Sequence, residues 1–174
     1  MADSFPALST EPAKVMIEYN DPGFNIVLYH PEIPANTGNI GRLCVGTNST
    51  LHLIRPFRFL IDDKSLKRAG LDYWPQLQYI IHDSIDEIIE KTPLDRLWFC
   101  TTKSANSYLE RNYRPGDYFI FGPESKGLPE DLLNAYTERC VTIPMSPKIR
   151  SVNLSNSVSA ILYEAVRQNL SAKG

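Results

Sequence analysis

Residues 36–42 (NTGNIGR) combine two glycines, two asparagines and an arginine shortly after an apolar segment. Glycines between a strand and a helix are typical of phosphate-binding loops. This segment, however, lacks the Lys-Ser/Thr pair and the Gly-x-Gly-x-x-Gly order of nucleotide loops, which argues against a nucleotide-phosphate site. Arg42 is expected in the first turn or two of a helix, where the helix dipole disfavours a cation. Arg42 is therefore either a functional side chain or one half of a surface ion pair.

A second candidate segment is FGPESKGLP, residues 121–129. Gly122 would let a ligand approach the backbone, and Gly127 would permit a positive φ angle. Glu124, between them, would either anchor the loop or hold an arginine of a partner.

The third segment is RSVNLSNSVSAILYEAV, residues 150–166, whose apolar residues from Leu154 onward have helical spacing. Serine or asparagine nevertheless fills six of the nine positions from Ser151 to Ser159. Both residue types are poor helix formers, because their side chains compete for neighbouring backbone groups. They can hold a tight turn between a loop and a helix, and such departures from local propensity are expected at functional sites.

Other kinds of chemistry find little support in the sequence. No Ser-His-Asp, Cys-His or paired-carboxylate arrangement is legible. The three histidines lie near no cysteine pair and have no i, i+4 spacing, so we expect no metal site: His30, His52 and His82. The three cysteines are odd in number and widely spaced, which favours reduced thiols in a cytoplasm: Cys44, Cys100 and Cys140.

The composition is that of one folded domain. The chain has 174 residues, of which 43% are hydrophobic and 22% charged, the usual profile of a globular protein. No apolar run approaches the roughly 20 residues of a membrane span. Residues 1–24 have no continuous apolar core and do not resemble a signal peptide. We expect them to form a flexible arm, followed by a single domain over residues 25–174.

Positive charge is concentrated in one stretch although the formal net charge is −2. Between positions 55 and 68 the chain has five basic and only two acidic residues, with aromatic residues among or just after them. The basic residues are Arg55, Arg58, Lys64, Lys67 and Arg68, and the acidic ones are Asp62 and Asp63. This stretch is either a solvated surface or a docking surface for a phosphate backbone.

Strands and helices are predicted to alternate, which implies a mostly parallel α/β sheet with helices on both faces. The region 60–80 is expected to be irregular. Strands are predicted at Asn25–Tyr29, Leu51–Ile54, Leu97–Thr101, Tyr118–Phe121 and Cys140–Ile143. Helices are predicted from about Gly38 to Thr47, at Ser84–Glu90 with Ser84 as N-cap, at Pro129–Tyr136 and over 153–170.

Four loops rich in Gly, Pro, Ser and Asn follow four of these strands, at the carboxyl ends where parallel sheets bind ligands. They are HPEIPANTGNIGR, TKSANS, GPESKGLP and PMSPKIRSVN. Together they predict a site built largely from backbone groups.

The blocks NTGNIGR, FGPESKGLP and IPMSPKIRSVNLSNSVSAILYEA resemble the three signature motifs of the SPOUT methyltransferase superfamily, in order and spacing. The resemblance covers about residues 25–170. Within it, NIVLYHPEIPANTGNIGRLC, DDKSLKRAGLDYW and TTK are similar to the small TrmL (YibK-like) branch. That branch is a bare catalytic domain that methylates the ribose 2′-hydroxyl of the wobble nucleotide, a cytidine or modified uridine, of certain leucine tRNAs.

The resemblance implies a deep C-terminal trefoil knot, an exception to the rule that chains avoid knots. S-adenosylmethionine would bind there without a metal, become S-adenosylhomocysteine, and contact mainly backbone groups of four residues: Cys100, Gly122, Ile143 and Ser151. The family usually forms a homodimer, with Arg42 at the reaction centre and the closing helix in the interface. Further candidates for substrate or interface contacts are Asn36, Glu124, Asn153, Lys67, Arg68 and Tyr163. An aliphatic residue is common at the position of Cys100.

The expected function is thus an S-adenosylmethionine-dependent tRNA 2′-O-methyltransferase of the cytoplasm. Two alternatives stay open at this point. One is a ribosomal-RNA 2′-O-methyltransferase of the same fold, and the other is an RNA-binding protein that keeps the fold without catalysis.

Overall fold

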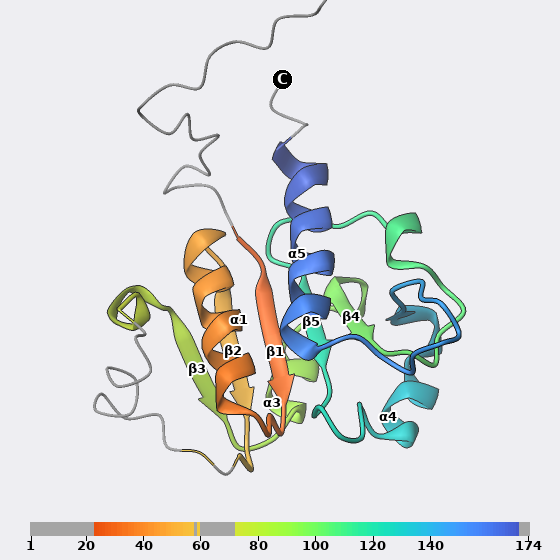
Figure 1. Ribbon diagram of the computed structural model, residues 1–174, viewed down its shortest axis with the longest axis horizontal. Coiled ribbons are helices and arrows are strands. Elements are labelled where there is room, and N and C mark those ends of the chain that lie inside the picture. Colours follow the sequence, from red (N-terminus) through yellow and green to blue (C-terminus); the bar gives the residue numbers. More distant parts are fainter. Residues whose placement is uncertain (1–22, 58, 60–71, 171–174) are drawn as a thin grey trace, which may run out of the picture.

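A six-stranded sheet in which all neighbouring strands are parallel forms the centre of the molecule (Figure 1). The computed structural model describes residues 23–57, 59 and 72–170. The strand order is β3-β2-β1-β5-β4-β6. The strands are β1 (Asn25–Tyr29), β2 (Thr50–Ile54), β3 (Tyr79–His82), β4 (Leu97–Cys100), β5 (Tyr118–Phe121) and β6 (Cys140–Val141).

Both faces of the sheet are covered, which explains the continuous apolar character of the central strands. In β1, Ile26, Val27 and Leu28 are all at most 1% exposed. Ile26 and Leu28 join one hydrophobic core, and Val27 joins the other, because successive side chains of a strand point to opposite faces. The α/β class with helices on both faces is therefore confirmed.

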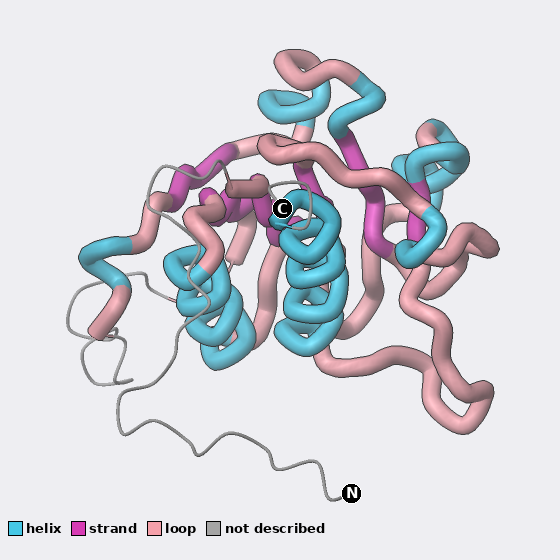
Figure 2. Tube along the Cα trace, turned by 90° about the horizontal axis from the view of Figure 1, so that it is seen from above, coloured by secondary structure: helices cyan, strands magenta, loops and turns pink. Residues whose placement is uncertain are grey.

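Two long helices lie side by side over one face of the sheet (Figure 2): α1 (Pro34–Gly46) and α5 (Leu154–Leu170). Two short helices pack into the other core: α3 (Asp86–Ile89) and α4 (Glu130–Ala135). The 3₁₀ turns are Trp74–Gln76, Leu94–Arg96, Tyr108–Glu110 and Thr137–Arg139. No helix in the described ranges is long and apolar enough to span a membrane.

Helix α1 begins four residues earlier than the sequence predicts, at Pro34 instead of Gly38. Proline suits the first turn, because its fixed φ angle is helical and its missing N–H is not needed there. Residues 34–37, expected in the loop before the helix, form its first turn, and Gly38 and Gly41 follow inside the helix. A Cβ atom on Gly41 would lie 3.2 Å from the Trp74 ring, so this glycine permits close packing. The segment is therefore not a loop that could cradle phosphate.

Strand β3 was not predicted, because residues 60–80 were expected to be irregular. Tyr79–His82 pairs with Leu51–Ile54 at the edge of the sheet. Tyr79 and Ile80 are 39% and 48% exposed, so this strand has no buried apolar run to announce it. Its extended backbone follows from its pairing with β2.

The predicted N-cap role of Ser84 is wrong in detail. The helix is shorter than predicted and its N-cap is Ile85. The Ser84 hydroxyl instead accepts a hydrogen bond from the backbone N–H of Asp86 at 3.1 Å, as in a local serine turn. The carboxylate of Glu87 accepts from the backbone N–H of Asp83.

The loop between β4 and β5 contacts two later parts of the chain, the segment just after β6 and the end of α5. Tyr108 donates its backbone N–H to the carbonyl of Thr142, just after β6. Further along, the backbone N–H of Tyr113 donates to the side chain of Gln168 near the end of α5. These contacts gather the segments that the expected trefoil knot would use, and the threading itself stays a prediction. The predicted arm at residues 1–24 lies almost wholly outside the described residues.

A row of polar side chains crosses three strands inside the sheet. Asn25 donates through Nδ2 to the carbonyl of Gly116, which turns its Oδ1 toward Nε2 of His52, 3.0 Å away. Nε2 therefore carries the proton, and Nδ1 of His52 accepts from Nε2 of His82 at 2.9 Å. Burial, and secondarily His82, lowers the pKa of His52 to about 4. His52 is thus held neutral.

We expect the free energy of unfolding to fall as pH falls from about 6.5 to 4. The unfolded chain binds a proton on His52 that the folded chain excludes, so acid favours unfolding. With a folded pKa of about 4, this loss reaches about 3 kcal/mol at pH 4. Urea denaturation of the wild type and His52→Gln at pH 7 and pH 4.5 measures it. Equal acid losses in both proteins would contradict the assignment.

Candidate active site

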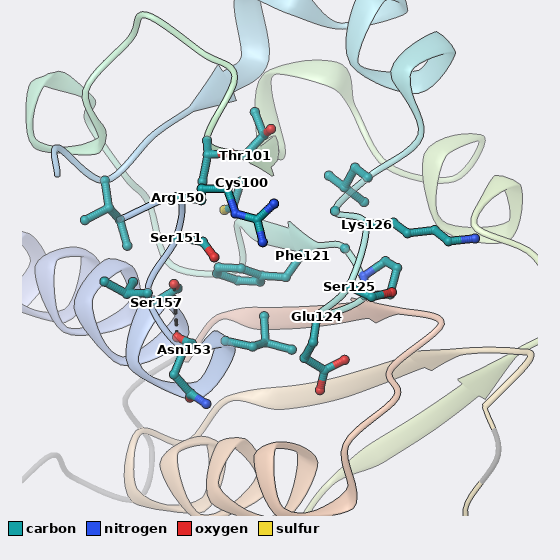
Figure 3. Close-up of a pocket in the computed structure, with 18 of the residues that line it drawn as sticks. Cys100, Thr101, Phe121, Glu124, Ser125, Lys126, Arg150, Ser151, Asn153 and Ser157 are labelled. Carbon is teal, nitrogen blue, oxygen red and sulfur yellow. Dashed lines mark hydrogen bonds between the residues drawn. The ribbon is translucent and has the colours of Figure 1, made fainter. Parts of the chain in front are cut away.

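A cavity of about 450 Å³ lies at the carboxyl ends of β4, β5 and β6 (Figure 3). Four segments of chain form most of its lining: residues 100–103, 121–128, alternate residues from 141 to 145, and the segment 150–154 that leads into α5. Ile33 and Asn36 contribute from the loop after β1 and the first turn of α1. The predicted gathering of four loops at one edge of the sheet is therefore confirmed.

The structure brings most of the predicted site residues to this cavity. Its lining includes all four expected donor contacts and three of the further candidates: Cys100, Gly122, Ile143, Ser151, Asn36, Glu124 and Asn153. Arg42 and Tyr163 are not among the lining residues. Lys67 and Arg68 lie outside the described residues.

Gly122 is the point where the loop after β5 turns back on itself. A Cβ atom there would lie 2.2 Å from the backbone of both Gly127 and Leu128, closer than any side chain tolerates. Gly127 has a φ of +70° and donates its N–H to the carbonyl of Pro123 at 2.9 Å. The two glycines therefore close a narrow loop that presents backbone groups to the cavity.

Glu124 joins this loop to the loop after β1. Its carboxylate accepts hydrogen bonds from the backbone N–H groups of Glu32 and Ile33, at 2.9 and 3.1 Å. It also accepts from Nδ2 of Asn36 at 3.0 Å. In return, Ser125 donates its N–H and hydroxyl to the carboxylate of Glu32. Of the two roles considered from the sequence, Glu124 fills that of the loop anchor.

Asn36 extends the same network to the third segment. Its Oδ1 accepts from Nδ2 of Asn153 at 3.0 Å. Asn153 in turn accepts, through Oδ1, from the N–H and the hydroxyl of Ser155 in the first turn of α5. The Ser/Asn-rich opening of this helix therefore holds a loop-to-helix turn, as the sequence predicts.

Arg42 lies in the third turn of α1, because the helix begins earlier than predicted. The expected conflict with the helix dipole at this position is therefore wrong. The guanidinium lies 3.7 Å from Asp72 and 4.9 Å from the centre of the Tyr73 ring. The Tyr73 hydroxyl donates to the carbonyl of Gly38. The surface ion pair considered from the sequence is present, but at 64% and 89% side-chain exposure it contributes little stability.

The cysteines offer no reactive thiolate at the site. Cys100 lines the cavity, and burial raises the pKa of its thiol well above the usual value, so it stays protonated. All three cysteines are free thiols. Within the described ranges, no three His, Cys, Asp or Glu side chains are grouped so as to hold a metal ion.

Sequence reasoning did not select two residues that the structure places at the site. Glu32 takes part in the clamp with Ser125. Arg150, which opens the quoted third segment, lines the cavity. The sequence offered one signal for Arg150, its position in a loop that was expected to bind a ligand through backbone groups. It offered no signal for Glu32.

Comparison with known proteins agrees with this geometry. The model of the SpoU rRNA methylase family matches residues 23–163. A tRNA (cytidine(34)-2′-O)-methyltransferase of Escherichia coli is 49% identical over 145 residues, which are 83% of this chain and 92% of that one.

Two solved structures have a similar fold. One, from work on the 2-OH methylation of C/U34 on tRNA, has a TM-score of 0.79 and 42% identity, covering 86% of this chain and 98% of that chain. The other is the SpoU methyltransferase AviRb of Streptomyces viridochromogenes in complex with AdoMet, with a TM-score of 0.72 and 24% identity. The match covers 86% of this chain and 59% of AviRb, and this likeness concerns the fold alone.

We expect Gly122→Ala to lower the free energy of unfolding by about 2 kcal/mol or more, because the new methyl group would overlap backbone that cannot move aside cheaply. Gly46→Ala is the matched control, since nothing lies within 4 Å of a Cβ atom there. The control should change stability by no more than about 1 kcal/mol. Urea denaturation compares the two, and similar midpoints would show that the loop tolerates a side chain.

Proposed function

Because the chain belongs to the SpoU rRNA methylase family, and within it to the TrmL-like branch, we propose that it methylates the ribose 2′-hydroxyl of nucleotide 34 in tRNA. The methyl donor proposed is S-adenosylmethionine. The finer substrate proposed is a cytidine or modified uridine at the wobble position of leucine tRNAs, which would place the activity in the cytoplasm.

The observation that carries the proposal is the cavity formed by the ends of β4, β5 and β6. Its volume and its lining of backbone-rich loops suit a nucleoside-sized ligand. The four expected donor contacts come from three segments, at the ends of β4, β5 and β6, and all four line the cavity: Cys100, Gly122, Ile143 and Ser151. The AdoMet complex of AviRb supports the choice of donor by analogy of fold.

The chain's own contribution to the reaction would be alignment. When bound, S-adenosylmethionine would supply a methyl group whose carbon the ribose oxygen attacks in line with the C–S bond; that bond breaks, S-adenosylhomocysteine leaves, and the hydroxyl gives up its proton. Backbone groups of the loops after β4, β5 and β6 would fix the donor, and holding the hydroxyl on the line of attack accounts for a large part of such accelerations. Arg42 would orient the hydroxyl or the adjacent phosphate. An arginine is essentially always protonated, so it would not act as the base.

Arg42 lies outside the cavity of its own chain, and a homodimer would resolve this separation. We propose that the cavity of one protomer receives Arg42 from its partner. Helices α1 and α5 lie side by side on the sheet, and their outer sides offer a surface for such contact (Figure 2). Tyr163 on α5 is 47% exposed, as an interface residue would be in a single chain. The basic stretch with Lys67 and Arg68 remains the proposed contact for tRNA phosphates.

The decisive experiment is incubation with labelled donor and total tRNA, followed by mass spectrometric mapping of the modified nucleotide. A 2′-O-methyl group on nucleotide 34 is the expected result. Methylation of ribosomal RNA alone would favour the first alternative. Donor binding or RNA binding without any methyl transfer would overturn the proposed activity.

Arg42→Ala should abolish methyl transfer and change the affinity for S-adenosylhomocysteine by less than about twofold, since Arg42 does not line the cavity. Single-turnover assays and calorimetry provide the two readouts. Asp72→Ala is the control, because it removes only the exposed ion-pair partner of Arg42. A parallel loss of ligand binding and activity in Arg42→Ala would contradict the assigned role.

Tyr163→Glu should shift the protein from dimer to monomer, because it places a charge where an apolar contact is proposed. Sedimentation velocity at assay concentration measures the change, and activity should fall with the dimer fraction. An active wild-type monomer at that concentration would rule the dimer out.

A further inference from the structure

The charges that line the cavity are unbalanced. Three cationic side chains line it, and Glu124 is the one carboxylate among the lining residues: Lys103, Lys126 and Arg150 are the cations. The carboxylate of Glu124 already accepts three hydrogen bonds from the loop after β1 and from Asn36. It is therefore committed to the loop clamp and is not a partner for a cation in the cavity.

The three cations differ in how they are placed. Lys103 lies 3.6 Å from Glu130 and so has a counter-charge outside the cavity. Figure 3 shows the Lys126 side chain pointing away from the other labelled residues. In the same view the Arg150 side chain extends toward the region between Cys100 and Phe121. Arg150 is thus the cation directed over the cavity.

Arg150 has no hydrogen bond or ion pair with any described residue, in contrast to most other arginines of this part of the chain. Arg139, for example, lies 3.6 Å over the Trp98 ring and donates to two backbone carbonyls, which identifies it as a structural arginine. Carboxylates pair with five further arginines: Arg42, Arg55, Arg96, Arg114 and Arg167. The fold therefore gives Arg150 no structural task.

The surroundings of Arg150 strengthen its attraction for an anion. Apolar side chains such as Phe121, Val141 and Ile143 form part of the cavity wall, and a low-dielectric wall focuses the field of a nearby charge. The N-terminus of the 17-residue helix α5 contributes positive potential at the same wall through Asn153 and Leu154. An anion entering the cavity would meet both.

We propose that Arg150 binds an anionic group of a substrate in this cavity, through the planar pair of N–H donors that a carboxylate or phosphate matches. The proposal rests on the proposed function, which offers two sources of such oxygens. One is the amino-acid carboxylate of the methyl donor. The other is a phosphate beside the target ribose. Arg150 is thus a substrate-binding residue that the three-motif pattern does not identify.

The test compares Arg150→Gln and Arg150→Lys with Lys148→Gln. Lys148 is exposed on the same loop but does not line the cavity, so its variant removes one positive charge nearby without touching the site. The donor arm measures the affinities for S-adenosylhomocysteine and for 5′-methylthioadenosine, which lacks the carboxylate. The RNA arm measures tRNA affinity as a function of salt concentration. Since Arg150 makes no hydrogen bond or ion pair with a described residue, its variants should keep the wild-type melting temperature.

If Arg150 binds the donor carboxylate, Arg150→Gln weakens S-adenosylhomocysteine binding about 10- to 100-fold and leaves 5′-methylthioadenosine unchanged. If it binds an RNA phosphate, tRNA affinity falls and the slope of log affinity against log salt decreases by about 1. Arg150→Lys should recover only part of either loss. An Arg150→Gln protein that matches Lys148→Gln in both arms overturns the inference.

The same experiments distinguish a failure of this inference from a failure of the proposed function. A wild type that methylates tRNA while Arg150→Gln behaves like the control refutes the inference alone. A wild type that binds S-adenosylhomocysteine through Arg150 but methylates no RNA refutes the proposed function alone.

Discussion

The carboxylate of Glu124 is the group on which the geometry of the site depends. Ordering the backbone of the loops after β1 and β5 opposes folding by about 1–2 kcal/mol per residue. Three hydrogen bonds to one carboxylate offset part of this cost and fix the two loops at a set distance. Hydrogen bonds to a charged group contribute about 1.5–3 kcal/mol each, more than neutral ones. The reciprocal bonds from Ser125 to Glu32 make the junction two-sided.

The hydrogen-bond network continues from Glu124 to the two long helices, α1 and α5. Asn36 links the carboxylate to Asn153, so the start of α1 and the start of α5 are held by one chain of side-chain hydrogen bonds. Further along α1, the close approach at Gly41 packs the helix on Trp74, and the neighbouring Tyr73 lies under Arg42. Helix α1 therefore carries the Asn36 hydrogen bonds at its start, and Gly41 brings the helix close enough to Trp74 for Arg42 to lie over the Tyr73 ring.

The sequence predicted correctly those elements whose local residue pattern has a single explanation. Strands β1 and β5 are buried on both faces, so their apolar runs are unambiguous, and the carboxyl-end loops follow from parallel topology. Strand β3 was not predicted because its half-exposed residues at the edge of the sheet form no continuous apolar run. The start of α1 was misplaced because proline and asparagine favour loops locally, whereas here Pro34 and Asn36 form part of the first turn of the helix. The clamp between Glu32 and Ser125 joins residues 93 positions apart, and nothing in either local sequence indicates the other.

Under the proposed function, the separation between Arg42 and the cavity would divide the site into two functional parts. Contacts within the chain hold the lining of the cavity in place, through the hydrogen bonds that join Glu124, Asn36 and Asn153. Arg42 points to the surface, where its exposed ion pair with Asp72 is weak enough to be exchanged for another partner. Binding and chemistry would then depend on different levels of structure, the first on the folded chain and the second on its assembly. In the proposed homodimer, the donor would bind in the cavity of one protomer, and the methyl group would be transferred only where the partner's Arg42 and the RNA meet that cavity.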